Sequence, residues 1–177
     1  MKLKKITAIL SLITISLILY SCGSIAEGHA RKAFTEESHA IPPDFGKYQN
    51  QILLIVLKNR SSYDKYLKKA TKSYLGTYEF VTEDQINSDK YRNKTIYRYI
   101  FDYSNGSTSS IIYHDTFNHN TATTRSHVTF KQFYIKDRYA DKTYISNYES
   151  GYFARAMKAY MQNLEIKRAS QHKSLMM

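Results

Sequence analysis

The apolar run at residues 52–57 is the feature that most constrains how this chain can fold. A run this short, uniformly apolar and mostly branched is typical of a strand covered on both faces. Apolar residues then recur at helical spacing from Tyr63 to Tyr74, while lysines occupy the opposite face. We therefore predict a central strand followed by an amphipathic helix packed on it, with Ser61 as the N-cap and Gly76 as the stop.

The rest of the body has the pattern of several strands closed by a helix. Residues 95–103 alternate strictly between two faces, which predicts a strand, and further strands are expected at residues 78–81, 110–115, 128–136 and 143–148. Asn105-Gly106 is a turn signal, so the strands on either side of it are expected to form a hairpin. Residues 151–167 carry an apolar stripe at helical spacing. This order predicts an α/β fold, with α+β as the alternative, in which helices cover one face of a mixed sheet.

The N-terminus has a different composition from the body. Lys2, Lys4 and Lys5 precede an uncharged, largely apolar run at residues 6–19. As a helix this run would be roughly 21 Å long, shorter than the ~30 Å hydrocarbon core of a bilayer. Its length and basic start favour a signal peptide over a membrane span. The run ends at Leu19-Tyr20-Ser21-Cys22, which contains the only cysteine of the chain.

These four residues resemble the lipobox of bacterial lipoproteins, although Tyr20 occupies a position where that family usually has a short residue. The resemblance implies that Cys22 is joined to a diacylglycerol, that residues 1–21 are cleaved, and that the new N-terminus is acylated. With Cys22 modified, no thiol remains for a disulfide, so the core alone must hold the fold. Two alternatives are a core position for Cys22 and an uncleaved leader that serves as the anchor.

The residue after the cysteine bears on where such a lipoprotein resides. Gly23, rather than an aspartate, permits transfer to the outer membrane in the best-studied sorting system of this family. The following residues lack the acidic run that some bacteria use for export to the cell surface. The resemblance therefore implies a lipid-anchored envelope protein on the outer membrane that faces the periplasm.

The body is long enough for one domain with a full core. Residues 22–40 carry mixed charges and few large apolar side chains, which favours a flexible tether. Pro42 and Pro43 predict an extended entry into a single α/β domain at residues 41–168. Residues 169–177 lack a pattern and are expected to form a frayed tail.

Histidines provide the only concentrated set of candidate metal ligands. His114, Asp115, His119 and His127 lie close together in the sequence, and such side chains bind zinc when they converge. Their spacing favours exposed polar residues instead, because neighbours on a strand point to opposite faces and the intervening segment is rich in Asn and Thr. A metal-dependent enzyme that uses this loop is the second alternative function.

No other catalytic signature is present in the sequence. It contains neither a G-x-S-x-G turn nor a glycine-rich phosphate loop, and adjacent carboxylates such as Glu83 and Asp84 occur where a helix would begin. We therefore expect no catalytic residues, and no cofactor other than the covalent lipid. The expected role is a non-enzymatic binding or assembly accessory.

The basic charge of the chain points to anionic partners. The formal net charge is +11, and cleavage of the leader removes three lysines to leave about +8. Lys94, Tyr97, Arg98 and Tyr99 could form a face for an anionic glycan or lipopolysaccharide, which is the first alternative function. The competing interpretation of these tyrosines is a core face. For an exported protein we expect envelope polymers, lipid or another envelope protein as partners, and no nucleic acid.

Overall fold

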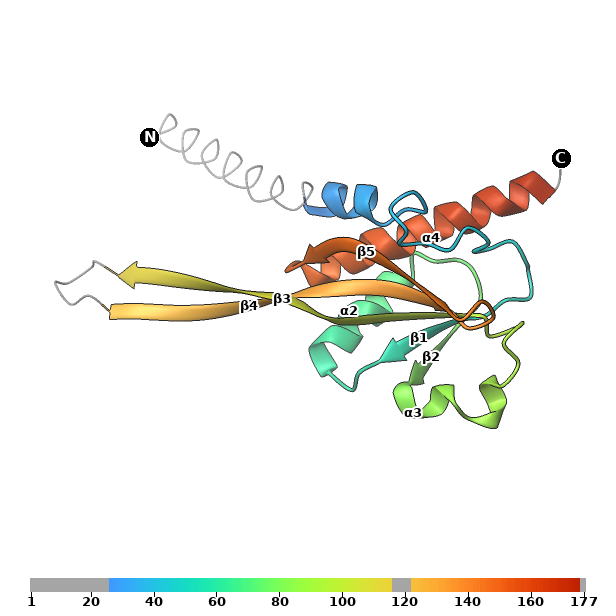
Figure 1. Cartoon of the computed structure of the whole chain (residues 1–177), viewed down its shortest axis with the longest axis horizontal. Coiled ribbons are helices and arrows are strands. Elements are labelled where there is room, and N and C mark those ends of the chain that lie inside the picture. Colours follow the sequence, from blue (N-terminus) through green and yellow to red (C-terminus); the bar gives the residue numbers. More distant parts are fainter. Residues whose placement is uncertain (1–25, 116–121, 176–177) are drawn as a thin grey trace, which may run out of the picture.

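The computed structural model describes residues 26–115 and 122–175, and for residues 111–115, 122–124 and 175 it describes the backbone alone. Figure 1 shows a sheet with helices packed on it and a long two-stranded ribbon that leaves the body. The elements in chain order are β1 (Leu53–Leu57), α2 (Ser61–Thr71), β2 (Tyr78–Thr82), α3 (Glu83–Ile86), the 3-10 turn η1 (Asp89–Tyr91), β3 (Tyr99–Asp115), β4 (Ala122–Asp137), β5 (Lys142–Ser150) and α4 (Phe153–Leu175).

The five strands form one mixed sheet in the order β2-β1-β3-β4-β5. β1 is parallel to both of its neighbours, whereas β3, β4 and β5 are successively antiparallel. The predicted α/β fold is therefore confirmed, with a helix after the first strand and a long C-terminal helix packed on the sheet.

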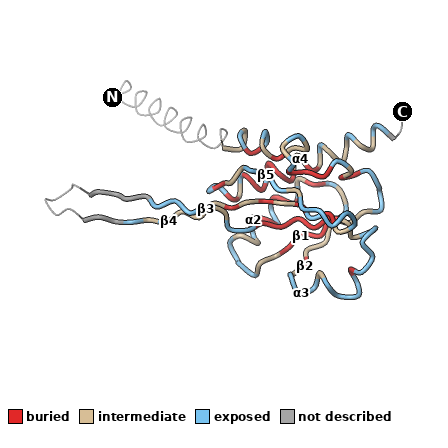
Figure 2. The backbone as a smooth tube through the Cα atoms, viewed as in Figure 1, coloured by how far each residue is buried: buried red, intermediate tan, exposed pale blue. Residues whose placement is uncertain are grey.

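The two faces of β1 lie in two different apolar clusters. Leu53 and Ile55 belong to the larger cluster, together with side chains of α2 and α4. Leu54 and Val56 belong to the smaller cluster, which the α3–η1 segment covers through Tyr91. Figure 2 shows this strand as one of the most deeply buried parts of the chain. The run of apolar residues is thus explained by burial on both sides of the sheet.

The ends of α2 differ from the predicted ones. Arg60, not Ser61, is the N-cap, because the Asp64 carboxylate accepts the amide of Lys58 at 3.1 Å and starts the helix one residue earlier. The helix ends at Thr71, well before Gly76. The chain turns there so that Tyr74, which is 5% exposed, can enter the core.

Residues 26–40 are part of the folded domain, so the prediction of a flexible tether through residue 40 was wrong. Residues 26–33 are helical, and Ala30 and Phe34 are fully buried. The Phe34 ring packs on those of Phe133 and Tyr160, with centroids 5.5 and 4.6 Å away. Two apolar residues four positions apart make one short helical stripe, which is enough to bury this segment against α4 although Glu27, Arg31 and Lys32 are charged.

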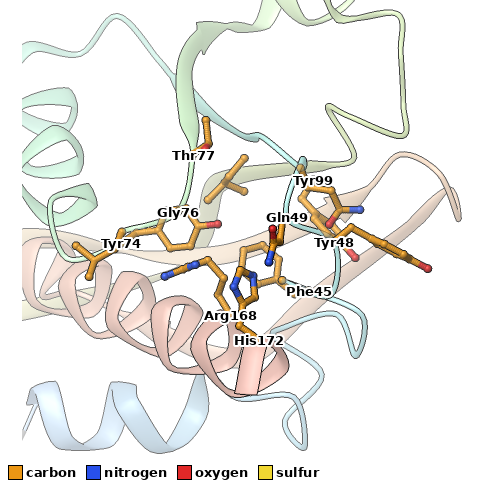
Figure 3. Close-up of a pocket in the computed structure, with 13 residues that line it drawn as sticks. Phe45, Tyr48, Gln49, Tyr74, Gly76, Thr77, Tyr99, Arg168 and His172 are labelled. Atoms are coloured by element: carbon orange, nitrogen blue, oxygen red, sulfur yellow. The ribbon is translucent and has the colours of Figure 1, made fainter. Parts of the chain in front are cut away.

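The predicted tail is also largely folded, because α4 continues to Leu175 rather than ending near residue 168. The side chains of Arg168 and His172 face the segment that precedes β1 and line a pocket there (Figure 3). Gln171 donates to the backbone carbonyl of Pro43 at 3.3 Å. The apolar clusters of the domain therefore draw on residues from 30 to 164, and the folded domain starts no later than residue 26.

The turn predicted at Asn105-Gly106 does not exist, because β3 runs through it as one strand of 17 residues. The register with β4 shifts between Asn105 and Thr108, so this dipeptide forms a bulge. A side chain at Gly106 would collide with the Glu149 carboxylate, which accepts the amide of Ser107 at 2.8 Å. The Asn-Gly dipeptide does not mark a turn; it marks a place where Glu149 of β5 closely contacts the β3 backbone.

The hairpin partner of β3 is β4, and the two strands extend beyond the sheet as a ribbon (Figure 1). Within β3, only Ile100 and Phe101 pair with β1, and β5 pairs with β4 only from Lys131 to Asp137. We call residues 107–115 and 122–130 the β3–β4 arm. β4 and β5 form a second hairpin, which joins the strands predicted at residues 128–136 and 143–148.

Candidate functional site

The predicted ligand face at residues 94–99 does not form a common surface. Tyr99 is 2% exposed and belongs to the larger cluster, whereas Tyr97 packs on Tyr91 in the smaller one, with ring centroids 5.0 Å apart. Only Lys94 is fully exposed. The prediction was wrong because β3 begins at Tyr99, so the alternation of the strand does not extend back to Tyr97.

Arg98 is engaged with a buried carboxylate rather than available to an anionic ligand. Its Nη2 lies 2.7 Å from Asp137 Oδ2 and its Nε 3.0 Å from Oδ1, while Asp44 is 3.6 Å away. Burial alone would raise the pKa of Asp137, but Arg98 and the amides of Ala140 and Tyr139 hold that pKa below its usual range. This pair fastens the start of β3 to the end of β4.

The histidines of the second alternative lie on or near the β3–β4 arm. In the backbone register His127 is opposite Ser110, and its Nδ1 lies 3.0 Å from the Ser110 hydroxyl. His114 is opposite Thr123, about 13 Å further along the ribbon by strand geometry. The side chain of His114 and all of His119 lie outside the described residues. Among the side chains that are described, no group of three His, Cys, Asp or Glu could hold a metal ion.

A polar cluster beyond the end of β1 has its hydrogen bonds satisfied. Lys58 Nζ contacts the Asp102 carboxylate at 2.9 Å and also the carboxylate of Glu83. The Tyr134 hydroxyl donates to Asp102 at 2.7 Å. Asp102 also accepts the amide of Tyr103 at 2.7 Å. These contacts join the residue after β1 to the start of α3, to β3 and to β4, so we assign this cluster a structural role.

A pocket with unsatisfied polar groups lies at the opposite end of β1, between the preceding segment and the C-terminal half of α4 (Figure 3). Its volume is about 130 Å³. Aromatic side chains form much of its wall, and amide, guanidinium and imidazole groups complete it. The lining residues used below are Phe45, Tyr48, Gln51, Tyr74, Tyr99, Arg168 and His172.

Two lining residues have buried polar atoms without a partner. Among the described side chains only three such atoms occur, and they include the hydroxyl of Tyr99 and Oε1 of Gln51. Burial raises the pKa of the Tyr99 phenol, so this hydroxyl stays protonated and can donate. A buried polar group without a hydrogen bond is costly, and native structures keep few of them. Both atoms lack a partner within the protein and are enclosed, so a ligand in the pocket reaches them only when neighbouring side chains move aside.

The charged groups of the pocket are largely balanced. Arg168 donates to the Glu165 carboxylate through Nε at 2.9 Å and Nη2 at 2.6 Å, which raises the Arg168 pKa. Glu165 in turn accepts the amide of Leu75 at 2.9 Å, which ties α4 to the segment after α2. His172 lies about one helical turn after Arg168 in α4, and its imidazole also lines the pocket. With Arg168 neutralised by Glu165, the pocket favours an uncharged polar ligand.

Two glycines, Gly46 and Gly76, shape the pocket because a side chain at either position would collide with its walls. Gly46 has a φ of 81°, and a Cβ there would meet the Arg168 backbone, so only glycine allows the segment before β1 to approach α4 this closely. A Cβ at Gly76 would collide with the Tyr74 hydroxyl and lie 2.8 Å from Arg168 Cδ. Any larger residue at Gly76 would therefore displace two lining side chains.

Sequence reasoning missed this pocket because its residues come from four distant parts of the chain. No local spacing joins Gln51, Tyr74, Tyr99 and His172, and the two glycines that shape the pocket, Gly46 and Gly76, belong to no motif in the sequence. Helix α4 continues past residue 168, which we did not predict, and this extension adds His172 to the wall of the pocket.

Comparison with known proteins adds no relative to this description. Models of protein families, curated proteins and solved structures all gave no match, so function must be inferred from the chain's own residues.

No helix in the described part of the chain is long and apolar enough to cross a membrane.

Proposed function

We propose that the chain is a lipid-anchored protein of the bacterial cell envelope that acts as a non-enzymatic binding accessory. The similarity of Leu19-Tyr20-Ser21-Cys22 to a lipobox supports a diacylglycerol and an N-acyl chain on Cys22. Gly23 supports the outer membrane, with the domain facing the periplasm. The observation that carries the binding role is the pocket in which Tyr99 and Gln51 present buried polar atoms without partners.

The ligand class that best fits this pocket is a single hydroxyl-rich ring, such as one sugar unit of an envelope glycan. Hydroxyl groups can accept from Tyr99 and donate to Gln51, and aromatic walls suit the apolar face of a ring. The pocket volume of about 130 Å³ is well below the roughly 300–1,000 Å³ of pockets that hold drug-sized ligands, so it suits one small ring rather than a chain. Glycan recognition thus remains our proposal, but in this pocket instead of at residues 94–99.

Replacing Tyr99 by phenylalanine should separate binding from stability. The hydroxyl has no partner in the ligand-free protein, so its removal should leave the free energy of unfolding unchanged or raise it by up to about 1 kcal/mol. The same change should weaken ligand binding roughly tenfold, since one hydrogen bond to the ring is lost. Urea unfolding measures the first effect. Titration with methyl glucoside, methyl galactoside and N-acetylglucosamine, followed by NMR at the Gly76 amide, measures the second.

The matched control is Tyr152→Phe, which removes a phenol that is 66% exposed and outside the pocket, and should change neither quantity. Gly76→Ala should reduce binding by displacing the Tyr74 and Arg168 side chains. A Tyr99→Phe variant that is clearly less stable would show that the hydroxyl is satisfied. If none of the three sugars shifts the Gly76 resonance, the proposed ligand class is wrong.

Cys22→Ala tests the anchor separately from the pocket. The wild-type chain should be recovered from host membranes with an intact mass equal to residues 22–177 plus the lipid. The variant should instead keep its leader or appear in the soluble fraction. A variant that remains in membranes at the mature mass would rule out lipidation as the anchor, and an unmodified full-length wild type would favour the retained leader.

A further inference from the structure

A basic groove lies between α2 and α4, beside the helical segment at residues 26–33, and has a volume of about 540 Å³. Four of its lining residues are cationic and one is acidic. The cations are Lys69, Lys72, Arg155 and Lys158, and the acid is Glu27.

Three of the four cations are free of acidic partners. Lys158 pairs with Glu27 at 3.3 Å, whereas the ion pairs of the described residues include none with Lys69, Lys72 or Arg155. All four basic side chains are exposed. The groove therefore presents uncompensated positive charge to whatever lies against it.

Exposed tyrosines extend this surface. Tyr66 lines the groove and is 46% exposed, and Tyr152, which is 66% exposed, lies in the adjoining hollow that shares Tyr66 and Arg155 with it. Tyrosine combines an apolar ring with a polar hydroxyl, which suits the boundary between headgroups and hydrocarbon in a bilayer.

The groove is also close to the proposed lipid attachment point. Asn163 of α4 donates to the backbone carbonyls of Arg31 and Phe34 at 2.7 and 2.6 Å, so the segment that carries Glu27 is fixed to the domain. Four peptide units separate Cys22 from residue 26, and they can span at most about 14 Å. A lipid on Cys22 would therefore hold the groove near the headgroups.

We propose that the basic groove, together with Tyr66 and Tyr152, lies against the bilayer and binds the phosphates of anionic phospholipid headgroups. This inference rests on the proposed lipid anchor for its geometry, but the charge of the groove is independent of it. Each lysine or arginine close to an anionic surface strengthens association roughly fivefold. The surface would then fix which side of the domain faces the membrane.

The test uses residues 22–177 with Cys22→Ser, which contain every described residue but carry no lipid. This protein should sediment with vesicles of phosphatidylglycerol mixed with phosphatidylcholine, and not with phosphatidylcholine alone. The triple variant Lys69→Gln, Lys72→Gln, Arg155→Gln should partition roughly 100-fold less, from three fivefold losses. Added salt should reduce wild-type partitioning, because it screens exposed charges.

The matched control removes three other exposed cations, Lys94→Gln, Lys136→Gln and Lys142→Gln, and so lowers the net charge equally. It should keep most of the partitioning. Equal losses in the two triple variants, or equal binding to both kinds of vesicle, would overturn the proposal. Because no lipid is attached in this experiment, its outcome is separate from that of the mass measurement on Cys22.

Discussion

Replacing Phe34 by alanine should lower the free energy of unfolding by about 4 kcal/mol. The ring is fully buried and packs edge-on against Phe133 and Tyr148, with both centroids 5.5 Å away, and at a tilt on Tyr160. The alanine would leave a cavity among three aromatic rings that are themselves held by the sheet and α4. Urea unfolding followed by circular dichroism measures the loss.

Lys32→Ala is the matched control, since this exposed residue lies on the same segment and should leave the free energy of unfolding unchanged. A flexible tether would give no effect from either change, so an unaltered Phe34→Ala protein would contradict the packing of residues 26–40. The result matters for the membrane proposal as well, because a loose segment would not hold the basic groove near the lipid.

Asp137→Asn should be the second most damaging change, with an expected loss of about 3 kcal/mol. Asp137 is 1% exposed and accepts from Arg98 and from the amides of Tyr139 and Ala140, at 3.0 and 3.1 Å respectively. An asparagine keeps the shape but leaves the Arg98 guanidinium without its main anion. The double variant Arg98→Gln, Asp137→Asn should lose less than the sum of the single changes, which a double-mutant cycle would measure.

The same pair predicts how stability depends on pH. The pKa of Asp137 is lowered in the folded protein, so its contribution is complete above the unfolded value near 4 and disappears as the pH falls through the lower folded value. The urea midpoint of the wild type should therefore drop more steeply below pH 4 than that of Asp137→Asn. Parallel curves for the two proteins would show that the carboxylate is not preferentially stabilised in the fold.

The elements that the sequence predicts best are those whose burial leaves a long or uniform pattern. Residues 52–57 predicted a doubly covered strand because both faces of β1 are packed, and the apolar stripe of α4 predicted its helix. The segment at residues 26–40 was misjudged because its contribution to the core depends on little more than Ala30 and Phe34. A helix that buries one short stripe has a composition close to that of a solvated linker.

Other features could not be read from local patterns because distant residues create them. Gly106 has the signature of a turn, yet its role is to admit the Glu149 carboxylate from β5. Tyr97 and Tyr99 alternate as a strand face would, but the strand begins between them. The pocket depends on Tyr99 and Gln51 having no partners, which only the folded arrangement reveals.

Because β3 is continuous, the β3–β4 arm is joined directly to the central part of the sheet. One strand carries Ile100, which is registered with β1, and also the outer half of the β3–β4 arm, so the arm and the sheet share one unbroken backbone. The weakest point along that backbone is the bulge between Asn105 and Thr108, where the regular ladder with β4 is interrupted. Bending of the arm is therefore expected to concentrate at this hinge, beside the Glu149 contact, and to leave the parallel strands undisturbed.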